Sequence, residues 1–380
     1  MGGRAMLIGL LLTGCIQRGG DSDRVPTEVK DVLAGVGPAV VQPALARFAA
    51  TTPALESALA EWTGAEATRA PAQAAWRAAM RAWQEVEAHQ LGPTASSLTA
   101  VGGADLRDAV YSWPTVNPCR VDQETVAGGW DSASYFTGSL VNVTGLDALE
   151  HLLFIDGTAN VCPSQVAINA DGTWDALGDD GVRAARAAHA GALAAQLTRS
   201  SAELVQSWDG FSDTLAEAGT KGSTYDTADD GLNAIFDALF YLESATKDRK
   251  LAVPLGLDEC DTATCPESVE LAPSGLSTDA IAANLVGGRA LFTGAEGAGL
   301  DDLLTELGHG DLADQVLAAF DDADAAVAAV DGPIDSVLST DLAAVQALHS
   351  AVGALTDLLK GDLATVLALR VPAEAAGDND

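Results

Sequence analysis

Apolar residues recur at intervals of three and four along most of the chain, which is the spacing of amphipathic helices. Alanine and leucine dominate and β-branched runs are short, so the composition favours helix over strand. The pattern predicts helices over residues 28–50, 54–62, 71–90, 144–155, 180–217, 227–249, 278–287, 300–306, 311–330 and 341–368. We therefore predict an all-α protein built from two packed helical, four-helix-type bundles.

A turn-rich stretch near the middle of the chain divides these helices into two groups. We expect residues 157–180 to connect a first lobe of about 28–156 with a second lobe of about 181–369. Within the connection, the turn residues Asn169 to Thr173 favour a hairpin between short strands around 163–173.

Two helical segments resemble each other, Gly145 to Phe154 and Gly231 to Phe240. Duplication of one bundle would explain the likeness. A chance likeness between helices rich in alanine and leucine would explain it equally well.

The N-terminus has the pattern of an export signal. Met1 to Arg4 carries one positive charge, and the apolar run from Ala5 to Leu12 is far shorter than the roughly 20 residues that span a bilayer. It predicts a signal peptide over residues 1–14. Leu12-Thr13-Gly14-Cys15 resembles the bacterial lipobox, in which the cysteine is acylated, although a chance cysteine behind an ordinary signal peptide is the alternative.

Lipidation of Cys15 would make the membrane a partner and residues 15–27 a flexible tether. We expect a lipid-anchored protein of the cell envelope. Ile16 stands where some bacteria place a retention Asp, which favours the outer membrane.

The other four cysteines are an even number, as expected of disulfides in an exported chain. Cys260 and Cys265 enclose only four residues and should pair together, which leaves Cys119 to pair with Cys162. Zinc ligation is the alternative, but the sequence has no CxxC pair or nearby histidine cluster to support it.

The chain has 54 acidic and 20 basic residues and a net charge of −34. Such a charge argues against nucleic acid as a partner, because phosphate binding needs clustered Lys and Arg. It attracts cations, although an acidic proteome or a salty habitat would explain it as well.

A first candidate site lies in the helix predicted over 71–90. Trp76, Met80, Trp83 and Glu87 fall on one helical stripe, so Glu87 continues a row of large apolar side chains. A buried carboxylate needs a metal, an Arg or backbone donors, whereas a Glu87 beyond the edge of the core would be solvated.

A second candidate site lies in the helix predicted over 144–155. Asp147, Glu150 and His151 are spaced so that they can converge on one cation. Oxygen-rich ligation favours a hard ion such as iron or calcium. The alternative is structural, because Thr144 followed by Asp147 is also an N-cap with an acid in the first turn.

The chain resembles the imelysin family, also called the M75 or insulin-cleaving membrane protease family, from about residue 30 to 368. The matching motifs are Ala75-Trp76 to Glu87-Ala88, Leu91-Gly92-Pro93, Tyr111-Ser112-Trp113-Pro114, Gly145 to Phe154, Lys247 to Leu255, Leu291-Phe292-Thr293-Gly294 and Leu300 to Leu304. The resemblance implies two helical bundles with a site between them, an envelope location and an association with iron uptake.

The family signature is Gly-x-His-x-x-Glu, which Gly145 and Glu150 match, whereas Asp147 stands at the histidine position. His151 and His89 are candidates for compensating ligands. The resulting predicted ligand set is Glu87, Asp147, Glu150, His151 and His89, and the residues expected to line the site are Trp113, Trp83 and Gly145.

Three functions are compatible with these features. The first is a lipoprotein that binds a metal ion or metal-bearing ligand and acts with iron-uptake components. The second is an envelope interaction scaffold with a degenerate site. The third is a metallopeptidase, which the sequence favours least because it contains no HExxH motif and has Asp147 at the signature histidine position.

Overall fold

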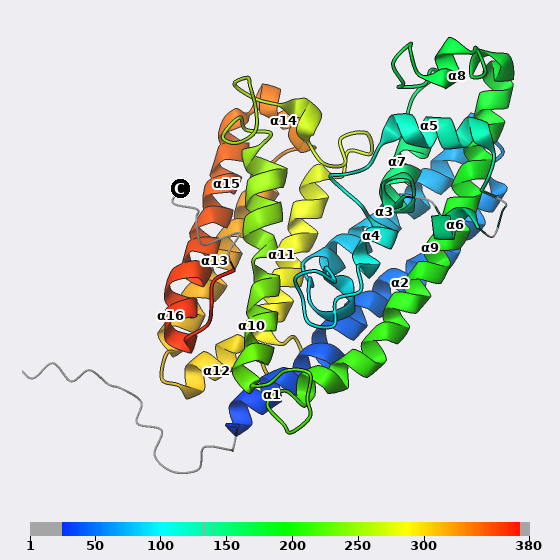
Figure 1. The fold of residues 1–380 in the computed structure, drawn as a ribbon. Coiled ribbons are helices and arrows are strands. Elements are labelled where there is room, and N and C mark those ends of the chain that lie inside the picture. Colours follow the sequence, from blue (N-terminus) through cyan, green and yellow to red (C-terminus); the bar gives the residue numbers. More distant parts are fainter. Residues whose placement is uncertain (1–24, 131, 133, 139, 373–380) are drawn as a thin grey trace, which may run out of the picture.

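The computed structural model describes residues 25–372 except positions 131, 133 and 139. Within this part of the chain the regular structure is helical and contains no strand (Figure 1), so the prediction of an all-α fold is confirmed. The signal peptide predicted over 1–14, the lipidation predicted at Cys15 and most of the predicted tether lie outside the described residues.

The first bundle is organised around two long antiparallel helices, α2 (Gln42–Glu61) and α9 (Gly178–Ala216). It also contains α1 (Thr27–Gly35), the π-helix η1 (Val36–Val41), α3 (Glu66–Glu87) and α7 (Gly145–Phe154). α9 lies along α2 and also packs on α7 (Figure 1). The boundary between the bundles therefore follows α9, whereas the sequence placed it before residue 181 and assigned this helix to the second lobe.

The second bundle contains α10 (Ala228–Leu239), the π-helix η5 (Leu242–Ala252), α11 (Ser277–Thr293), α12 (Leu300–Glu306), α13 (Gly310–Ala329), α14 (Ile334–Thr340), α15 (Leu342–Leu358), η7 (Leu359–Leu363) and α16 (Ala364–Leu367). α11 packs on α13 within this bundle and on α3 of the first. One hydrophobic core runs through both bundles, from Phe48 and Trp83 to Phe292 and Phe320. The contact between α3 and α11 thus joins the two bundles.

Short helices occupy the connections. They are η2 (Gly92–Thr94), α4 (Leu106–Val110), α5 (Pro118–Ala127), α6 (Tyr135–Gly138), η3 (Val141–Val143), α8 (Ala167–Ala170), η4 (Asp175–Leu177) and η6 (Pro266–Ser268). The strands predicted around 163–173 are wrong, because this stretch forms turns and α8. The Asn169 amide nitrogen donates to the carbonyl of Cys162 (2.8 Å) and Asn160 donates to the Asn169 oxygen (2.7 Å), so side chains supply the local hydrogen bonds.

The break predicted between residues 50 and 54 is absent, since α2 continues through Pro53. Proline has no N–H to donate to the carbonyl four residues earlier. Here the hydroxyl of Thr52 donates to that carbonyl, on Ala49, at 3.1 Å. A side chain thus replaces the missing backbone bond.

The segments that start at Gly145 and Gly231 are similar in sequence, but they do not occupy equivalent positions in their helices. Gly145 begins α7 with φ +82°, whereas Gly231 lies inside α10. Internal duplication is therefore not confirmed.

Two helical stretches, Thr27–Glu61 and Leu342–Leu367, are long and apolar enough to cross a membrane by length and composition alone. Of their most apolar windows, 50% and 33% are buried within the fold. Packing in the bundles is an equally good reason for their apolar character.

Candidate functional site

A group of buried or partly buried polar side chains lies where α3 meets η5 and α11. We call it the interbundle cluster, and it consists of Gln84, Glu87, Arg107, Tyr111, Tyr241, Lys250, Glu270 and Asn284. Its members come from both bundles and from the loops between helices. The cluster is therefore a product of the tertiary fold.

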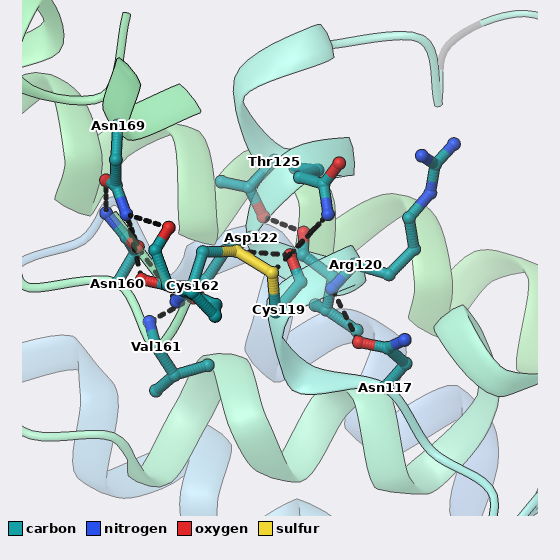
Figure 2. Close-up of a disulfide and its surroundings, with 12 residues drawn as sticks. Asn117, Cys119, Arg120, Asp122, Thr125, Asn160, Val161, Cys162 and Asn169 are labelled. Atoms are coloured by element: carbon teal, nitrogen blue, oxygen red, sulfur yellow. Dashed lines mark hydrogen bonds between the residues drawn. A yellow bond between two sulfur atoms is a disulfide. The ribbon is translucent and has the colours of Figure 1, made fainter. Parts of the chain in front are cut away.

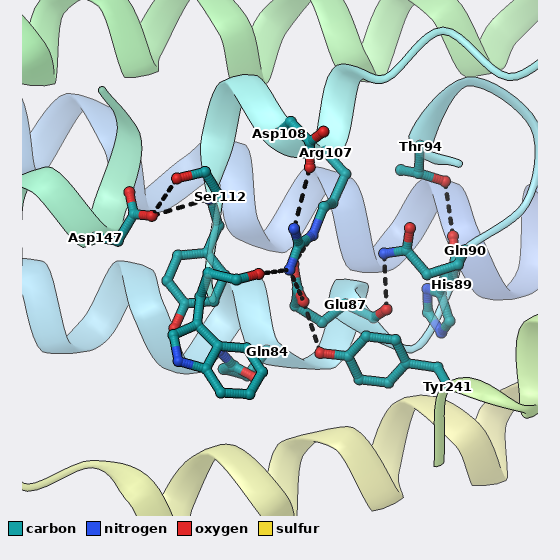
Figure 3. Close-up of polar contacts among 12 residues, drawn as sticks. Gln84, Glu87, His89, Gln90, Thr94, Arg107, Asp108, Ser112, Asp147 and Tyr241 are labelled. Atoms are coloured by element: carbon teal, nitrogen blue, oxygen red, sulfur yellow. Dashed lines mark hydrogen bonds and ion pairs between the residues drawn. The ribbon is translucent and has the colours of Figure 1, made fainter. Parts of the chain in front are cut away.

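Glu87 lies at one end of this cluster and is fully buried, together with Trp76, Met80 and Trp83 of the predicted stripe. Its counter-ion is Arg107, whose Nε and Nη2 each lie 3.1 Å from a carboxylate oxygen of Glu87 (Figure 3). The Tyr241 hydroxyl donates to Glu87 Oε2 at 2.6 Å. An Arg was one of the partners that a buried Glu87 could take, and it satisfies this carboxylate.

The environment keeps Arg107 charged and the Tyr241 hydroxyl protonated, as their contacts with Glu87 require. Burial opposes the charge of Arg107, but the adjacent Glu87 carboxylate raises the net pKa of Arg107 above its usual value. Burial and Glu87 raise the pKa of Tyr241 well above its usual value. Tyr241 therefore remains a hydroxyl donor at neutral pH.

Lys250 and Glu270 form a second buried ion pair, with Nζ 2.9 Å from Oε2. Lys250 also donates to Gln84 (2.7 Å) and Asn284 (2.8 Å), and the Tyr111 hydroxyl donates to Glu270 Oε1 at 2.7 Å. Sequence reasoning did not single out this pair. Tyr111 and Lys250 lie in motifs that carry the resemblance to the imelysin family, but nothing in their spacing joins them to Glu270.

Asp147 and Glu150 of α7 are buried near this cluster and differ from Glu87 in their partners. Asp147 Oδ2 accepts hydrogen bonds from the Ser112 backbone N–H (3.1 Å) and hydroxyl (2.5 Å), as Figure 3 shows. Glu150 Oε1 accepts a hydrogen bond from the Ser274 backbone N–H at 3.0 Å. Neither carboxylate has an Arg or Lys within ion-pair distance in the part of the chain that the structure describes.

Burial without a counter-ion changes the protonation of both acids. Burial raises the pKa of Asp147 to about 6, although the hydrogen bonds from Ser112 partly oppose this. Burial raises the pKa of Glu150 to about 7, with added repulsion from Glu270 and Asp147. Both acids thus titrate close to neutral pH.

Gly145 positions α7 for these contacts. Its φ of +82° belongs to the left-handed region, and a Cβ at this position would lie 2.5 Å from the carbonyl oxygen of Val110. Glycine is therefore required both by the conformation and by the close approach of the backbone. It supports the site through the backbone, at the start of the helix that carries Asp147 and Glu150.

The two candidate histidines do not join the acids. His151 Nε2 lies 3.0 Å from Asp122 Oδ1, on the side of α5. His89 is fully buried, with Nε2 3.2 Å from the carbonyl of Gly287, and burial lowers its pKa to about 4. His89 is therefore neutral at physiological pH.

The structure does not bring the five predicted ligands together. No group of three or more His, Cys, Asp or Glu side chains arranged to hold a metal occurs within residues 25–372, the three undescribed positions aside. Glu87 is neutralised by Arg107 and the histidines have other partners. Of the predicted set, Asp147 and Glu150 lie three residues apart on α7, and neither has a cationic partner within the described residues.

The residues expected to line the site have separate roles. Trp83 packs against Phe48, with ring centroids 4.9 Å apart. The Trp113 carbonyl accepts from Arg107 Nη2 at 2.9 Å, and the Lys250 ammonium lies 5.7 Å from the centroid of the Trp113 ring. Trp113 therefore contacts both cations of the cluster, whereas Trp83 belongs to the core of the first bundle.

Both predicted disulfides are confirmed, Cys119–Cys162 and Cys260–Cys265. The first ties the N-terminus of α5 to the connection before α8 (Figure 2). Next to it, the buried Asp122 accepts from the Val161 N–H at 2.9 Å. The disulfide and Asp122 together attach this connection to α5.

Solved structures with the same fold are found among bacterial proteins. An imelysin-like protein from Psychrobacter arcticum 273-4 aligns with a TM-score of 0.69 at 19% identity, over 92% of this chain and 98% of that one. A protein of Parabacteroides distasonis ATCC 8503, named a "putative iron-regulated protein A precursor", aligns with a TM-score of 0.67 at 16% identity, over 91% of this chain and 97% of that one.

A comparison with curated proteins gives no match. The sequence model of the imelysin family, Peptidase_M75, matches residues 41–361, which include most of both bundles and the motif from Gly145 to Glu150. The resemblance identified from the motifs is confirmed, and the chain belongs to the imelysin family.

Proposed function

We propose that this protein is a lipid-anchored envelope protein that binds a hard metal cation through Asp147 and Glu150 and serves in iron acquisition. The observation that carries the proposal is a contrast in charge compensation. Glu87 is paired with the partly buried Arg107 and Glu270 with the buried Lys250, whereas Asp147 and Glu150 are buried without a cationic partner in the described chain.

Two carboxylates in this environment need either protons or a cation. Their raised pKa values of about 6 and 7 mean that loss of both protons near neutral pH leaves two buried negative charges close together. A bound cation would neutralise them. The hydroxyls of Ser112 and Ser274 add neutral oxygen donors beside the acids, and an all-oxygen set favours iron or calcium over zinc.

Two further observations favour iron. The chain belongs to the imelysin family, and one neighbour in fold is named as iron-regulated protein A. The net charge of −34 would also raise the local concentration of cations around the protein.

Metal stoichiometry tests the proposal. The purified protein should take up about one equivalent of ferric iron or calcium at pH 7.5, and Asp147→Asn combined with Glu150→Gln should abolish this uptake. Asp321→Asn with Asp324→Asn is the matched control, because these acids pair with Arg289 on an exposed surface. Retention of metal by the Asp147/Glu150 variant would reject the site.

The lipid anchor is tested separately. Cys15→Ala should abolish incorporation of labelled palmitate into the protein without changing its metal content. Undiminished palmitate labelling of the Cys15→Ala variant would contradict lipidation at this position.

A scaffold function is the second candidate, and the pairing within the interbundle cluster favours it. Arg107 and Lys250 already neutralise Glu87 and Glu270, so the bundles are joined without a metal. A scaffold would show no metal uptake in the wild type. The same stoichiometry experiment therefore separates the two functions.

A further inference from the structure

A pocket of about 480 Å³ opens beside α5, apart from the interbundle cluster. Its lining is mostly apolar and consists of Asn117, Pro118, Cys119, His151, Ile155, Val161 and Pro273. The volume lies within the range of small-molecule sites, which are typically about 300 to 1,000 Å³. His151 is the ionisable side chain in this lining.

The buried carboxylate of Asp122 fixes the orientation of the His151 ring. Asp122 is completely buried, and its two oxygens accept from His151 Nε2 (3.0 Å) and from the Val161 N–H (2.9 Å). Because a carboxylate oxygen faces Nε2, Nε2 is the ring nitrogen that donates to Asp122. The ring nitrogen left for a ligand is then Nδ1.

Nδ1 of His151 is available to a ligand. It makes no hydrogen bond within the described residues, and it is not among the polar atoms that the fold seals from solvent. The His151 side chain is 10% exposed, so the ring is held firmly while one edge remains accessible. A carboxylate that fixes the tautomer and orientation of a histidine is a common support for a binding group.

We propose that this pocket binds a small uncharged molecule with an apolar body and a hydroxyl group that forms a hydrogen bond with His151 Nδ1. The apolar body would lie against Pro118, Ile155 and Pro273. An anionic ligand is disfavoured by the net charge of −34, and an ammonium group would find no carboxylate in the lining, because Asp122 lies behind the histidine.

This site is independent of the proposed cation site. Glu150 and His151 are adjacent in α7, but Glu150 faces Ser274 whereas His151 faces Asp122. Loss of metal binding would therefore leave the pocket intact, and loss of the pocket would leave Asp147 and Glu150 unchanged.

Binding of 2-naphthol to the purified protein, measured by equilibrium dialysis, tests the proposal. We expect saturable binding at one site, and about tenfold weaker binding of 2-methoxynaphthalene, which has the same body but cannot donate. The anionic 2-naphthoate should also bind more weakly. His151→Phe should remove the preference for 2-naphthol over its methyl ether, whereas His309→Phe, at an exposed histidine, should retain it.

Val161→Trp is the second variant, because Val161 is 48% exposed at the pocket and its side chain lies outside the Asp122–His151 pair. It should block both probes by occupying the pocket. The proposal is overturned if 2-naphthol fails to bind the wild type, if the two naphthalenes bind the wild type equally, or if Val161→Trp leaves binding unchanged. If His151→Phe does not fold, the wild-type comparison and Val161→Trp still decide the outcome.

Discussion

Tyr241 and Glu87 are 154 residues apart in the sequence, and the Tyr241 hydroxyl donates a 2.6 Å hydrogen bond to Glu87 Oε2. Arg107 approaches the same carboxylate from a third segment of the chain, with two nitrogens at 3.1 Å. A buried acid at the end of α3 is therefore satisfied by side chains from outside its own helix. This arrangement ties the two bundles together and makes the stability of the interface sensitive to single substitutions.

Glu87→Gln should lower the free energy of unfolding by about 1 to 3 kcal/mol, because the partly buried Arg107 would keep only Asp108 as an ionised partner. Urea denaturation at pH 7.5 measures the change. Glu85→Gln is the matched control, since Glu85 lies on the same helix but pairs with Arg47, whose side chain is 55% exposed. The control should change stability by no more than about 1 kcal/mol. Equal losses in both variants would contradict the role assigned to Glu87.

The contribution of Asp147 and Glu150 to stability should decrease as pH rises. Burial raises their pKa values from 3.8 and 4.5 to about 6 and about 7, so the folded state binds more protons than the unfolded state between these limits. Stability from these groups is therefore full below about pH 4 and is lost as pH rises toward 7. The loss is on the order of 3 kcal/mol per group.

Urea denaturation between pH 4.5 and 7.5 in the absence of metal checks this expectation. Asp147→Asn combined with Glu150→Gln should gain stability relative to the wild type as pH increases, because the amides do not titrate. A wild-type minus variant difference that is flat across this range would show that the acids are not buried as described.

Gly145→Ala should destabilise the protein more than Gly157→Ala. Both glycines have positive φ, +82° and +72°, so both substitutions carry a similar backbone penalty of roughly 1 kcal/mol. A Cβ on Gly145 would also meet the Val110 carbonyl at 2.5 Å, whereas one on Gly157 meets nothing within 4 Å. Thermal denaturation should therefore give a larger decrease for Gly145→Ala, and metal uptake should fall with it.

The two disulfides should differ in their contribution to stability. Cys119–Cys162 closes a loop with a sequence separation of 43, and Cys260–Cys265 one with a separation of 5. Loop-closure entropy gives about 4 kcal/mol for the longer loop and about 2 kcal/mol for the shorter. Paired Cys→Ala variants compared by urea denaturation check the order, and a larger loss for the Cys260–Cys265 variant would contradict it.

Much of the fold could be predicted because helical periodicity is a local property. The helices predicted over 180–217 and 300–306 correspond closely to α9 and α12. The two disulfides followed from cysteine number and spacing. The break at Pro53 was wrong because a neighbouring hydroxyl replaces the backbone bond, and the strands around 163–173 were wrong because asparagine side chains stabilise turns there.

The candidate site could be predicted only in part. Periodicity placed Glu87 on a stripe that is buried in the structure, and Asp147 and Glu150 of α7 are buried as well. It did not identify the partners of Glu87, because Arg107 and Tyr241 come from other segments. Nor could it show that His151, one turn after Asp147, faces Asp122 on α5.

By itself the sequence determined the all-α class, the family and the chemical types of the buried groups, since these depend on local periodicity, motif order and residue identity. The tertiary structure alone decided which acids are neutralised. A buried carboxylate takes its charge state from whatever lies within a few ångströms, and for Glu87 and Glu270 those neighbours are Arg107 and Lys250, from segments far away along the chain. Asp147 and Glu150 accept hydrogen bonds from serines instead, and no Arg or Lys pairs with them within the described residues.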